Sequence, residues 1–245
     1  MNEWQDQGIV LAVRRHGENG AVVTLLTENY GRHAGYVYGA TSRNLRGTLE
    51  PGSHVSVHWK SRDDDGLGNF TLEMEKGYMV SVMDDPARMA AMLSACELVL
   101  KGLPEREKHA AVFHGMLALL ESFEGEMWEA TYIWWEMALL RELGFALDLE
   151  KCASTGEVDD LIYVSPKTGR AVSRAAGEIY KEKLLPLPQF VLGRGDVTAV
   201  DIRMGLELTG YFLRHKVFHA ANMDLPESRL TFAGRYELAF NVDFS

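Results

Sequence analysis

The first 76 residues alternate between apolar and polar positions in short segments, as strands with one buried face do. Val55, Val57 and Trp59, for example, alternate with three polar residues. Glycine, asparagine and aspartate mark the turns between the segments. We therefore predict five strands, at residues 7–14, 21–27, 32–39, 55–60 and 70–75.

Five short strands in fewer than 80 residues predict a small closed barrel. The oligonucleotide-binding barrel, or OB-fold, is a five-stranded barrel of this kind. One face of the third predicted strand carries Ala34, Tyr36 and Tyr38. These tyrosines have two open interpretations, because an aromatic ring can pack in a core or stack on a nucleic-acid base.

Beyond residue 83 the apolar period lengthens to three or four residues, which indicates helices. Asp85 and Pro86 suit a helix start, and Gly144 suits a helix end because glycine adopts the left-handed conformation easily. The pattern predicts three helices: one from residue 86 to a break at 102–104, one at 113–123 and one at 128–143. A hairpin of strands at 161–164 and 170–172 follows. After it we predict a short helix from its cap at Ser173 to Tyr180 and a long helix capped by Asp196. No clear period follows Pro226, so no element is predicted there.

The predicted architecture is α+β with two domains, which a length of 245 residues accommodates. An OB-fold β-barrel occupies residues 1–80. A mostly helical domain occupies residues 81–245 and contains a small hairpin at about 150–173.

Composition and cysteine usage point to the cytoplasm. An apolar fraction of 47% is ordinary for a soluble protein, and no apolar run approaches the ~18 residues of a membrane span. The first six residues lack the basic and apolar segments of a signal peptide. Cys96 and Cys152 are the only cysteines, which fits a reducing compartment. Cys96 lies on the apolar face of a predicted helix, so we expect a core residue.

Positive charge is concentrated in one stretch of the predicted barrel, although the chain carries a net charge of −10. Residues 32–62 hold five basic side chains against Glu50 alone, whereas residues 81–245 hold 17 basic and 25 acidic side chains. A solvated surface and a phosphate-binding surface are equally good interpretations of so small a patch. The candidate DNA-binding residues are Arg32, Arg43, Arg46, Lys60 and Arg62.

No motif in the sequence specifies an enzyme. His215 and His219 are spaced like metal ligands on a helix, but Lys216 stands where a metalloprotease needs its general-base glutamate. The sequence contains no glycine-rich loop followed by lysine, the motif that would predict phosphate transfer. It also contains no pair of carboxylates in a catalytic motif. We therefore predict a protein with no catalytic residue and no cofactor.

Several short segments, by their order and spacing, resemble one family. They are Gly8-Ile9-Val10-Leu11, Thr27-Glu28-Asn29-Tyr30-Gly31-Arg32, Gly39-Ala40-Thr41-Ser42-Arg43, Leu49-Glu50-Pro51-Gly52, the run from Glu136 to Phe145, and Cys152-Ala153-Ser154-Thr155-Gly156. On these residues the chain resembles, over nearly its whole length, the RecO family of bacterial DNA-repair proteins, the recombination mediators. The resemblance implies an OB-fold barrel followed by a helical domain with a small hairpin.

The resemblance also implies a function in homologous recombination. Family members bind single- and double-stranded DNA and anneal complementary strands. With RecR they help load RecA onto DNA coated by single-strand DNA-binding protein, so the implied location is the cytoplasm, at the nucleoid. Taken alone, the barrel pattern also fits an RNA-binding protein or a protein-docking adaptor.

The hairpin departs from the pattern of some family members. Those members carry four cysteines in two Cys-x-x-Cys pairs, the arrangement of a structural zinc site. Here Cys152 is followed by Thr155 where the first pair ends, and no further cysteine or histidine occurs before His215. One thiolate cannot hold zinc, so we predict a hairpin without metal.

A second candidate site lies on the predicted helix at 128–143. Trp134, Met137 and Arg141 share one helical face, apart from the apolar stripe of the same helix. Packing of Trp134 against another helix is the simplest interpretation. The resemblance implies another, because family members bind the acidic, phenylalanine-ending tail of single-strand DNA-binding protein in the helical domain. An aromatic ring beside an arginine suits such a tail.

Overall fold

The computed structural model describes residues 2–63 and 66–240, with side chains described up to Tyr236. Contacts divide these residues into two compact units: the chain up to Gly125 with Pro226–Phe232, and Glu126–Leu225 with the residues from Ala233 onward. This division keeps residues 81–125 with the barrel, so the predicted domain boundary near residue 80 stays a prediction. No helix within the described ranges is long and apolar enough to cross a membrane.

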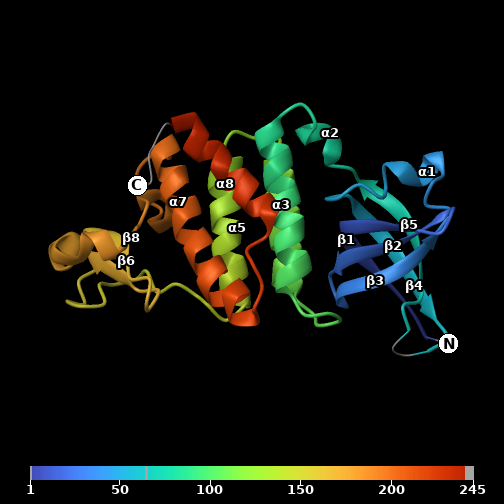
Figure 1. Ribbon diagram of the computed structural model, residues 1–245, viewed down its shortest axis with the longest axis horizontal. Coiled ribbons are helices and arrows are strands. Elements are labelled where there is room, and N and C mark those ends of the chain that lie inside the picture. The colour runs from blue at the N-terminus through green and yellow to red at the C-terminus, as the bar shows by residue number, and fades with distance from the viewer. Residues whose placement is uncertain (1, 64–65, 241–245) are drawn as a thin grey trace. The chain divides into compact units, whose positions relative to one another are not determined.

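The first unit contains a closed five-stranded barrel of strand order β1-β2-β3-β5-β4 (Figure 1). Its strands are β1 (Asn2–His16), β2 (Gly20–Thr27), β3 (Gly31–Tyr38), β4 (His54–Ser61) and β5 (Asn69–Lys76). Alternating apolar side chains such as Val23, Val55 and Trp59 fill the interior. The predicted fold class, an OB-fold barrel followed by a helical region, is confirmed. The largest difference is in β1, which begins well before the predicted residue 7.

The long strand β1 closes the barrel because it pairs with two partners. Its first half runs antiparallel to β4, and its second half runs antiparallel to β2. A register shift between Val10 and Ala12 lies between the two halves, where a bulge lets a strand bend. A parallel pairing of Tyr36 with Asn69 joins β3 to β5 and completes the ring.

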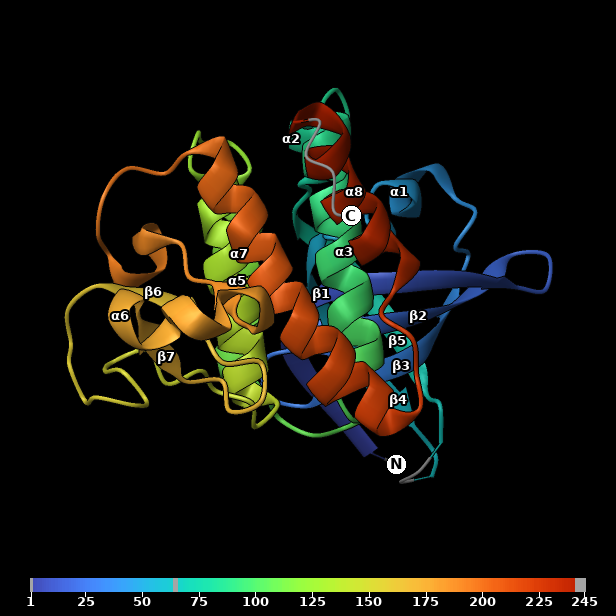
Figure 2. The same ribbon diagram turned by 60° about the vertical axis from the view of Figure 1, so that its left-hand side comes forward.

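The other elements of the first unit are helices. They are α1 (Arg43–Arg46), α2 (Met79–Val82), α3 (Pro86–Gly102), α4 (Ala110–Ser122) and the start of α8 (Glu227–Phe240). α3 begins as predicted, because the Asp85 side chain accepts hydrogen bonds from two backbone N–H groups of its first turn. Cys96 of α3 is buried, which raises the pKa of its thiol to about 12 and confirms a core residue. Both ribbon views place α1 at a rim of the barrel away from the start of β1 (Figure 2).

The second unit combines a helical pair with a small sheet of order β7-β6-β8. Its elements are α5 (Trp128–Glu142), β6 (Leu161–Val164), β7 (Ala171–Ser173), α6 (Arg174–Gly177), the 3-10 turns η1 (Glu178–Lys183), η2 (Gln189–Leu192) and η4 (His219–Ala221), β8 (Leu185–Pro186), α7 (Ala199–Phe212) and the π-helical segment η3 (Leu213–Phe218). Thr209 of α7 donates a hydrogen bond to the buried Glu136 carboxylate of α5. α5 ends as predicted, with Gly144 left-handed and the Phe145 N–H bonded to the Leu140 carbonyl.

One predicted helix start is wrong, and another lies where predicted but lacks the side-chain hydrogen bond of a cap. Thr198 rather than Asp196 caps α7, in a capping box where Thr198 and Asp201 each accept the other's backbone N–H. Ser173 occupies the N-cap position of α6 as predicted, but its hydroxyl donates to the Cys152 sulfur and makes no capping hydrogen bond. For Ser173, a nearby sulfur thus competes for the side chain that the sequence pattern selects.

The helix α8 lies after Pro226, where the sequence pattern predicts no element. Its buried side chains include Phe232 and Tyr236, together with Arg229. An arginine among the buried positions interrupts the apolar period, which is why the pattern gave no helix signal there.

Candidate nucleic-acid interface

Alternate residues of β3 lie on opposite sides of the barrel wall. His33, Gly35 and Val37 point inward and are buried, whereas Tyr36 is half-buried and Tyr38 is 70% exposed. The structure therefore decides between the two interpretations of the tyrosines: both lie on the outer face, and neither is a core residue.

His16, Tyr36 and Tyr38 form one aromatic cluster on this outer face, which we name the aromatic platform. The rings of Tyr36 and Tyr38 are 4.7 Å apart between centroids, and those of His16 and Tyr36 are 6.0 Å apart. Gly20 pairs with both His16 and Tyr38, and a methyl group on Gly20 would overlap the Tyr36 hydroxyl. The Tyr36 ring therefore lies across β2 at the position without a side chain. Exposed rings of this kind are surfaces on which nucleic-acid bases stack.

Basic side chains flank the platform on the neighbouring strands. On one side, Tyr36 pairs with Val22 of β2, which in turn pairs with Arg14 of β1. On the other side, Tyr36 pairs with Asn69 of β5, which in turn pairs with Lys60 of β4. Because paired strands lie ~4.8 Å apart, the Cα atoms of Arg14 and Lys60 each lie about 10 Å from that of Tyr36. Cations on both sides of a stacking surface are the arrangement used for single-stranded nucleic acid.

Four of the five predicted DNA-binding residues are exposed. Arg43 and Arg46 lie on α1 and form no ion pair with any described residue. Lys60 lies near the other end of β4, where its ammonium is 3.1 Å from the Glu3 carboxylate and lowers the pKa of Glu3. Arg62 follows directly after β4. The structure therefore distributes these cations over two parts of the barrel rather than gathering them at one rim.

Arg32 differs from the other four because its side chain is largely buried and is held by two partners within the protein. Its Nε donates to the Leu103 carbonyl at 2.9 Å, and its guanidinium is 3.1 Å from the Glu105 carboxylate. The side chain is only 17% exposed. Of the predicted set, Arg32 is the residue least free to contact a phosphate.

The sequence prediction missed Arg14, Arg15 and His16 at the end of β1. These residues lie outside the basic stretch at residues 32–62, but strand pairing brings the end of β1 beside β2 and, across β2, near β3. The available signal was the pair of arginines directly before the first turn, since the loop between the first two strands of an OB-fold borders its binding face.

Arg15 leaves β1 on the opposite face from Arg14 and borders a cavity of about 290 Å³, which we name the rim cavity. The residues that line it are Val13, Arg15, Ala21, Ala40, Thr41, Arg46, Leu49 and Glu50. The rim cavity thus brings Arg46, a predicted DNA-binding residue, together with an arginine that the sequence prediction missed.

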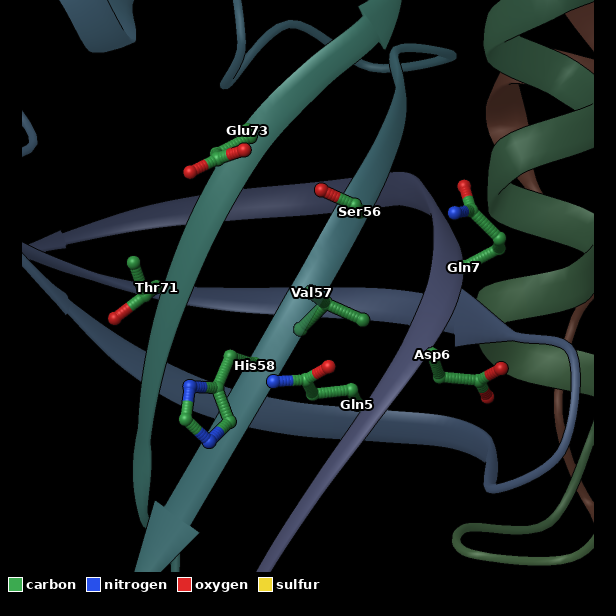
Figure 3. Close-up of a pocket in the computed structure, with 8 residues that line it drawn as sticks. All are labelled: Gln5, Asp6, Gln7, Ser56, Val57, His58, Thr71 and Glu73. Atoms are coloured by element: carbon green, nitrogen blue, oxygen red, sulfur yellow. The ribbon is translucent and has the colours of Figure 1, made fainter.

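A larger cavity of about 480 Å³ lies over β1, β4 and β5, and its lining is polar (Figure 3). The residues that line it are Gln5, Asp6, Gln7, Ser56, Val57, His58, Thr71 and Glu73. Its carboxylates, Asp6 and Glu73, are opposed only by His58, which itself lies 3.6 Å from Glu3. This charge balance disfavours a phosphate backbone, so we leave the polar cavity outside the candidate interface.

The second predicted site lies on α5. Trp134 is 41% exposed, and its ring packs edge-to-face against Phe190 at 5.6 Å between centroids. Arg141 is exposed, Met137 is half-buried, and the apolar stripe of the helix is buried as expected. The geometry thus leaves part of the Trp134 ring exposed, with Arg141 exposed on the same helix. A role in partner binding stays a prediction.

The turn from Cys152 to Gly156 is held by hydrogen bonds. The Cys152 N–H donates to the Glu157 carbonyl, and the Gly156 N–H donates to the Cys152 carbonyl. Burial alone raises the pKa of the Cys152 thiol, but hydrogen bonds from Ser173 and Thr155 outweigh it and lower the pKa to about 6. Among the described residues no group of three or more histidines, cysteines and carboxylates could hold a metal ion. A hairpin without zinc stays a prediction.

Comparison with known proteins confirms the family resemblance. The family described as Recombination protein O N terminal matches residues 1–78, and Recombination protein O C terminal matches residues 83–224. The chain is 46% identical over 239 residues to the DNA repair protein RecO of Rhodospirillum centenum, covering 97% of this chain and 96% of the relative. It is 47% identical over 230 residues to the DNA repair protein RecO of Caulobacter vibrioides, covering 93% and 95%. The chain therefore belongs to the RecO family of DNA repair proteins.

Proposed function

We propose that this chain is a recombination mediator that binds single strands of DNA on the outer face of its barrel and anneals them to complementary strands. The observation that carries the proposal is the aromatic platform with Arg14 and Lys60 on either side. The family supports it, since the named relatives are DNA repair proteins.

Phosphate contacts supply most of the affinity in this proposal. Each arginine or lysine that neutralises a phosphate releases counterions, so binding falls as salt rises. The contacts come from Arg14 and from the predicted set, with Arg32 contributing least because Leu103 and Glu105 engage it. The acidic remainder of the chain repels DNA and confines it to these cations. Double-stranded DNA is the weaker ligand, because its stacked bases cannot use the platform.

Stacking explains how a bound strand stays ready to anneal. A tyrosine ring covers the flat face of a base, and the cations hold the phosphates, so the pairing edge of the base remains accessible. A complementary strand can pair with that edge, after which the paired bases stack on one another and leave the rings. No covalent bond changes in this sequence of events, so the proposed function needs neither a catalytic residue nor a cofactor.

The test uses two charge-reversal variants of the full chain. Arg43→Glu with Arg46→Glu changes α1, and Lys167→Glu with Arg194→Glu makes the same charge change on exposed residues of the second unit. We expect the α1 variant to lose about tenfold or more in single-strand affinity and to flatten the salt dependence of binding, because phosphate contacts are lost.

Annealing should fall in parallel with affinity in the α1 variant, while the melting temperature stays unchanged because both residues are exposed. The second variant should bind and anneal like the parent. An α1 variant that did the same at low salt would remove α1 from the interface. Titration with RNA of the same sequence tests the RNA-binding alternative, which equal or tighter RNA binding would favour.

We further propose that the second unit binds the tail of single-strand DNA-binding protein through Trp134, Met137 and Arg141. The exposed part of the Trp134 ring takes the terminal aromatic ring, and Arg141 takes the carboxylate. In this proposal the chain acts in the cytoplasm, at the nucleoid, with RecR as its partner and RecA as the protein loaded onto DNA.

Arg141→Glu tests the tail site. We expect it to weaken binding of the tail peptide roughly tenfold, the effect of losing one charged hydrogen bond, without changing binding to naked DNA. Fluorescence anisotropy of a labelled tail peptide measures this, with Arg194→Glu as the control for charge alone. Unchanged tail affinity in Arg141→Glu would place the site elsewhere.

A further inference from the structure

We infer that the rim cavity between β1 and α1 binds one unpaired nucleotide of the DNA strand. The inference rests on the proposed function, because its ligand is a unit of the strand that the barrel binds. The cavity measures about 290 Å³, at the lower end of the range for small-molecule sites, which suits one nucleotide rather than a base pair.

Two guanidinium groups border the cavity from different elements. Arg15 comes from β1, and Arg46 is the last residue of α1. Neither forms a hydrogen bond or ion pair with another described residue, and both are exposed. A guanidinium matches a phosphate group through two parallel N–H donors. Two arginines without internal partners at one cavity therefore indicate a phosphate ligand.

The rest of the lining distinguishes a nucleotide from a bare phosphate. Val13, Ala21 and Leu49 supply apolar surface against which a sugar or base can pack. Glu50 adds a carboxylate that forms no ion pair with either arginine in the described chain. A carboxylate accepts hydrogen bonds from the amino groups of bases. Guanine presents two adjacent donors on its pairing edge, whereas thymine presents one, so the site favours guanine.

An acidic peptide is the other ligand whose carboxylates could meet the arginines, and two observations favour the nucleotide. Glu50 repels a second carboxylate but accepts amino groups. In addition, Arg14 and Arg15 are consecutive residues of β1, so their side chains leave opposite faces of the strand. One strand can therefore pass from the aromatic platform over the edge of the β1–β2 hairpin into the rim cavity.

The site selects single strands over duplexes. A nucleotide in a base pair has its pairing edge covered, so it cannot donate to Glu50 while it contacts the arginines. The rim cavity thus holds one nucleotide out of the stack, at the boundary between the bound strand and the strand that is free to pair.

The experiment measures binding of two labelled oligonucleotides to the full chain by fluorescence anisotropy across salt. One is oligothymidine, and the other carries a single guanine within the same strand. We expect Arg15→Gln and Arg46→Gln each to weaken binding about tenfold and to reduce the salt slope by about 0.7, the loss of one phosphate contact. Arg194→Gln, an exposed arginine of the second unit, is the matched control and should change neither.

Glu50→Gln separates base recognition from charge. The parent should prefer the guanine strand about tenfold. The variant should lose this preference while binding oligothymidine no more weakly than the parent, because it has one negative charge fewer. Retention of the guanine preference in Glu50→Gln would overturn the role of the carboxylate and with it the nucleotide assignment.

The failures of the two proposals are distinguishable. If Arg15→Gln behaved like Arg194→Gln while Tyr36→Ala lost affinity, the rim cavity would be excluded and the barrel interface would stand. A parent chain that bound no strand would overturn both. If an acidic peptide displaced the strand from the parent and bound Arg15→Gln more weakly, the cavity would be a peptide site and the nucleotide assignment would be wrong.

Discussion

The two sides of β3 carry aromatic clusters made from similar residues with opposite surroundings. On the inner side, the His33 ring lies 5.1 Å from Trp59, 5.2 Å from Trp4 and 6.0 Å from Phe70, and we name these four residues the inner cluster. On the outer side lies the aromatic platform, whose rings remain accessible. The face of the strand on which an aromatic side chain lies therefore determines whether it stabilises the barrel or is available for a ligand.

The largest expected contrast is in stability. Trp59→Ala should lower the free energy of unfolding by about 3–5 kcal/mol, because the change leaves a cavity in a closed core. The Trp59 side chain is 3% exposed, and its indole N–H donates to the Leu67 carbonyl at 3.0 Å. Urea denaturation measures this value, with Tyr38→Ala as the outer counterpart, expected within about 0.5 kcal/mol of the parent. Equal losses in the two variants would show that the inner and outer rings contribute equally to stability.

The inner cluster should also make stability depend on pH. Burial, with a smaller effect from the charge of Arg106, lowers the pKa of His33 from 6.5 to about 4. The folded state thus favours the neutral ring, so this contribution is complete above pH 6.5 and is lost as pH falls towards 4. The loss amounts to about 3 kcal/mol.

Urea denaturation at pH 7 and at pH 4.5 tests this prediction in the parent and in His33→Leu. The variant should lack most of this pH dependence, because it has no ring to protonate. Neither ring nitrogen of His33 has a hydrogen-bond partner within the part of the chain that the structure describes, so no local acceptor offsets protonation. The same pH dependence in both proteins would assign the effect to other groups.

Substitutions on the outer side of β3 should change DNA binding rather than the stability of the protein. Tyr36→Ala should weaken single-strand binding by about 1–3 kcal/mol, the value of one stacked base, without changing the melting temperature appreciably. Tyr36→Phe should bind like the parent, since the ring is retained. Fluorescence anisotropy with a labelled strand measures both variants.

Gly20→Ala offers a smaller change at the same place. The added methyl group overlaps the Tyr36 hydroxyl, so the ring must move away from β2. We expect a loss of affinity smaller than that of Tyr36→Ala, measured in the same titration. Full affinity in Gly20→Ala would show that the position of the ring across β2 does not matter for binding.

The smallest expected effect is that of removing metal from the protein. We predict that the hairpin, like the inner cluster, is stabilised by packing and hydrogen bonds and not by a metal ion. Cys152 lacks the further cysteines of a zinc site. A chelator should therefore leave the melting temperature unchanged, and elemental analysis should find less than stoichiometric zinc. One equivalent of zinc would contradict the prediction.

Alternation predicted the strands but not which face of each strand points inward. In β3 the pattern separates Tyr36 and Tyr38 from His33 and Val37, yet both sets contain apolar and aromatic residues. The register with β2 and β5 decides the direction, and that register depends on residues far away in the sequence. The tyrosines could therefore be found from the sequence but not placed.

The candidate cations show the same limit. Counting charge along the chain found Arg43 and Arg46, which are close in sequence. It missed Arg15, which meets Arg46 only because the chain after β3 returns to the end of β1, where the Ala40 N–H bonds to the Asn19 carbonyl. It included Arg32, whose partners lie more than 70 residues later in the sequence. Contacts over such separations leave no local pattern to detect.

The exposure of Trp134 has an optical consequence. The chain holds five tryptophans, and Trp134 is the most exposed of them, since Trp59, Trp128 and Trp135 are buried and Trp4 is half-buried. A collisional quencher in solution therefore removes mainly the emission of Trp134, while the buried indoles continue to fluoresce. Any molecule that covers this face of α5 shields that emission, so the protein carries a built-in fluorescent reporter that needs no added dye.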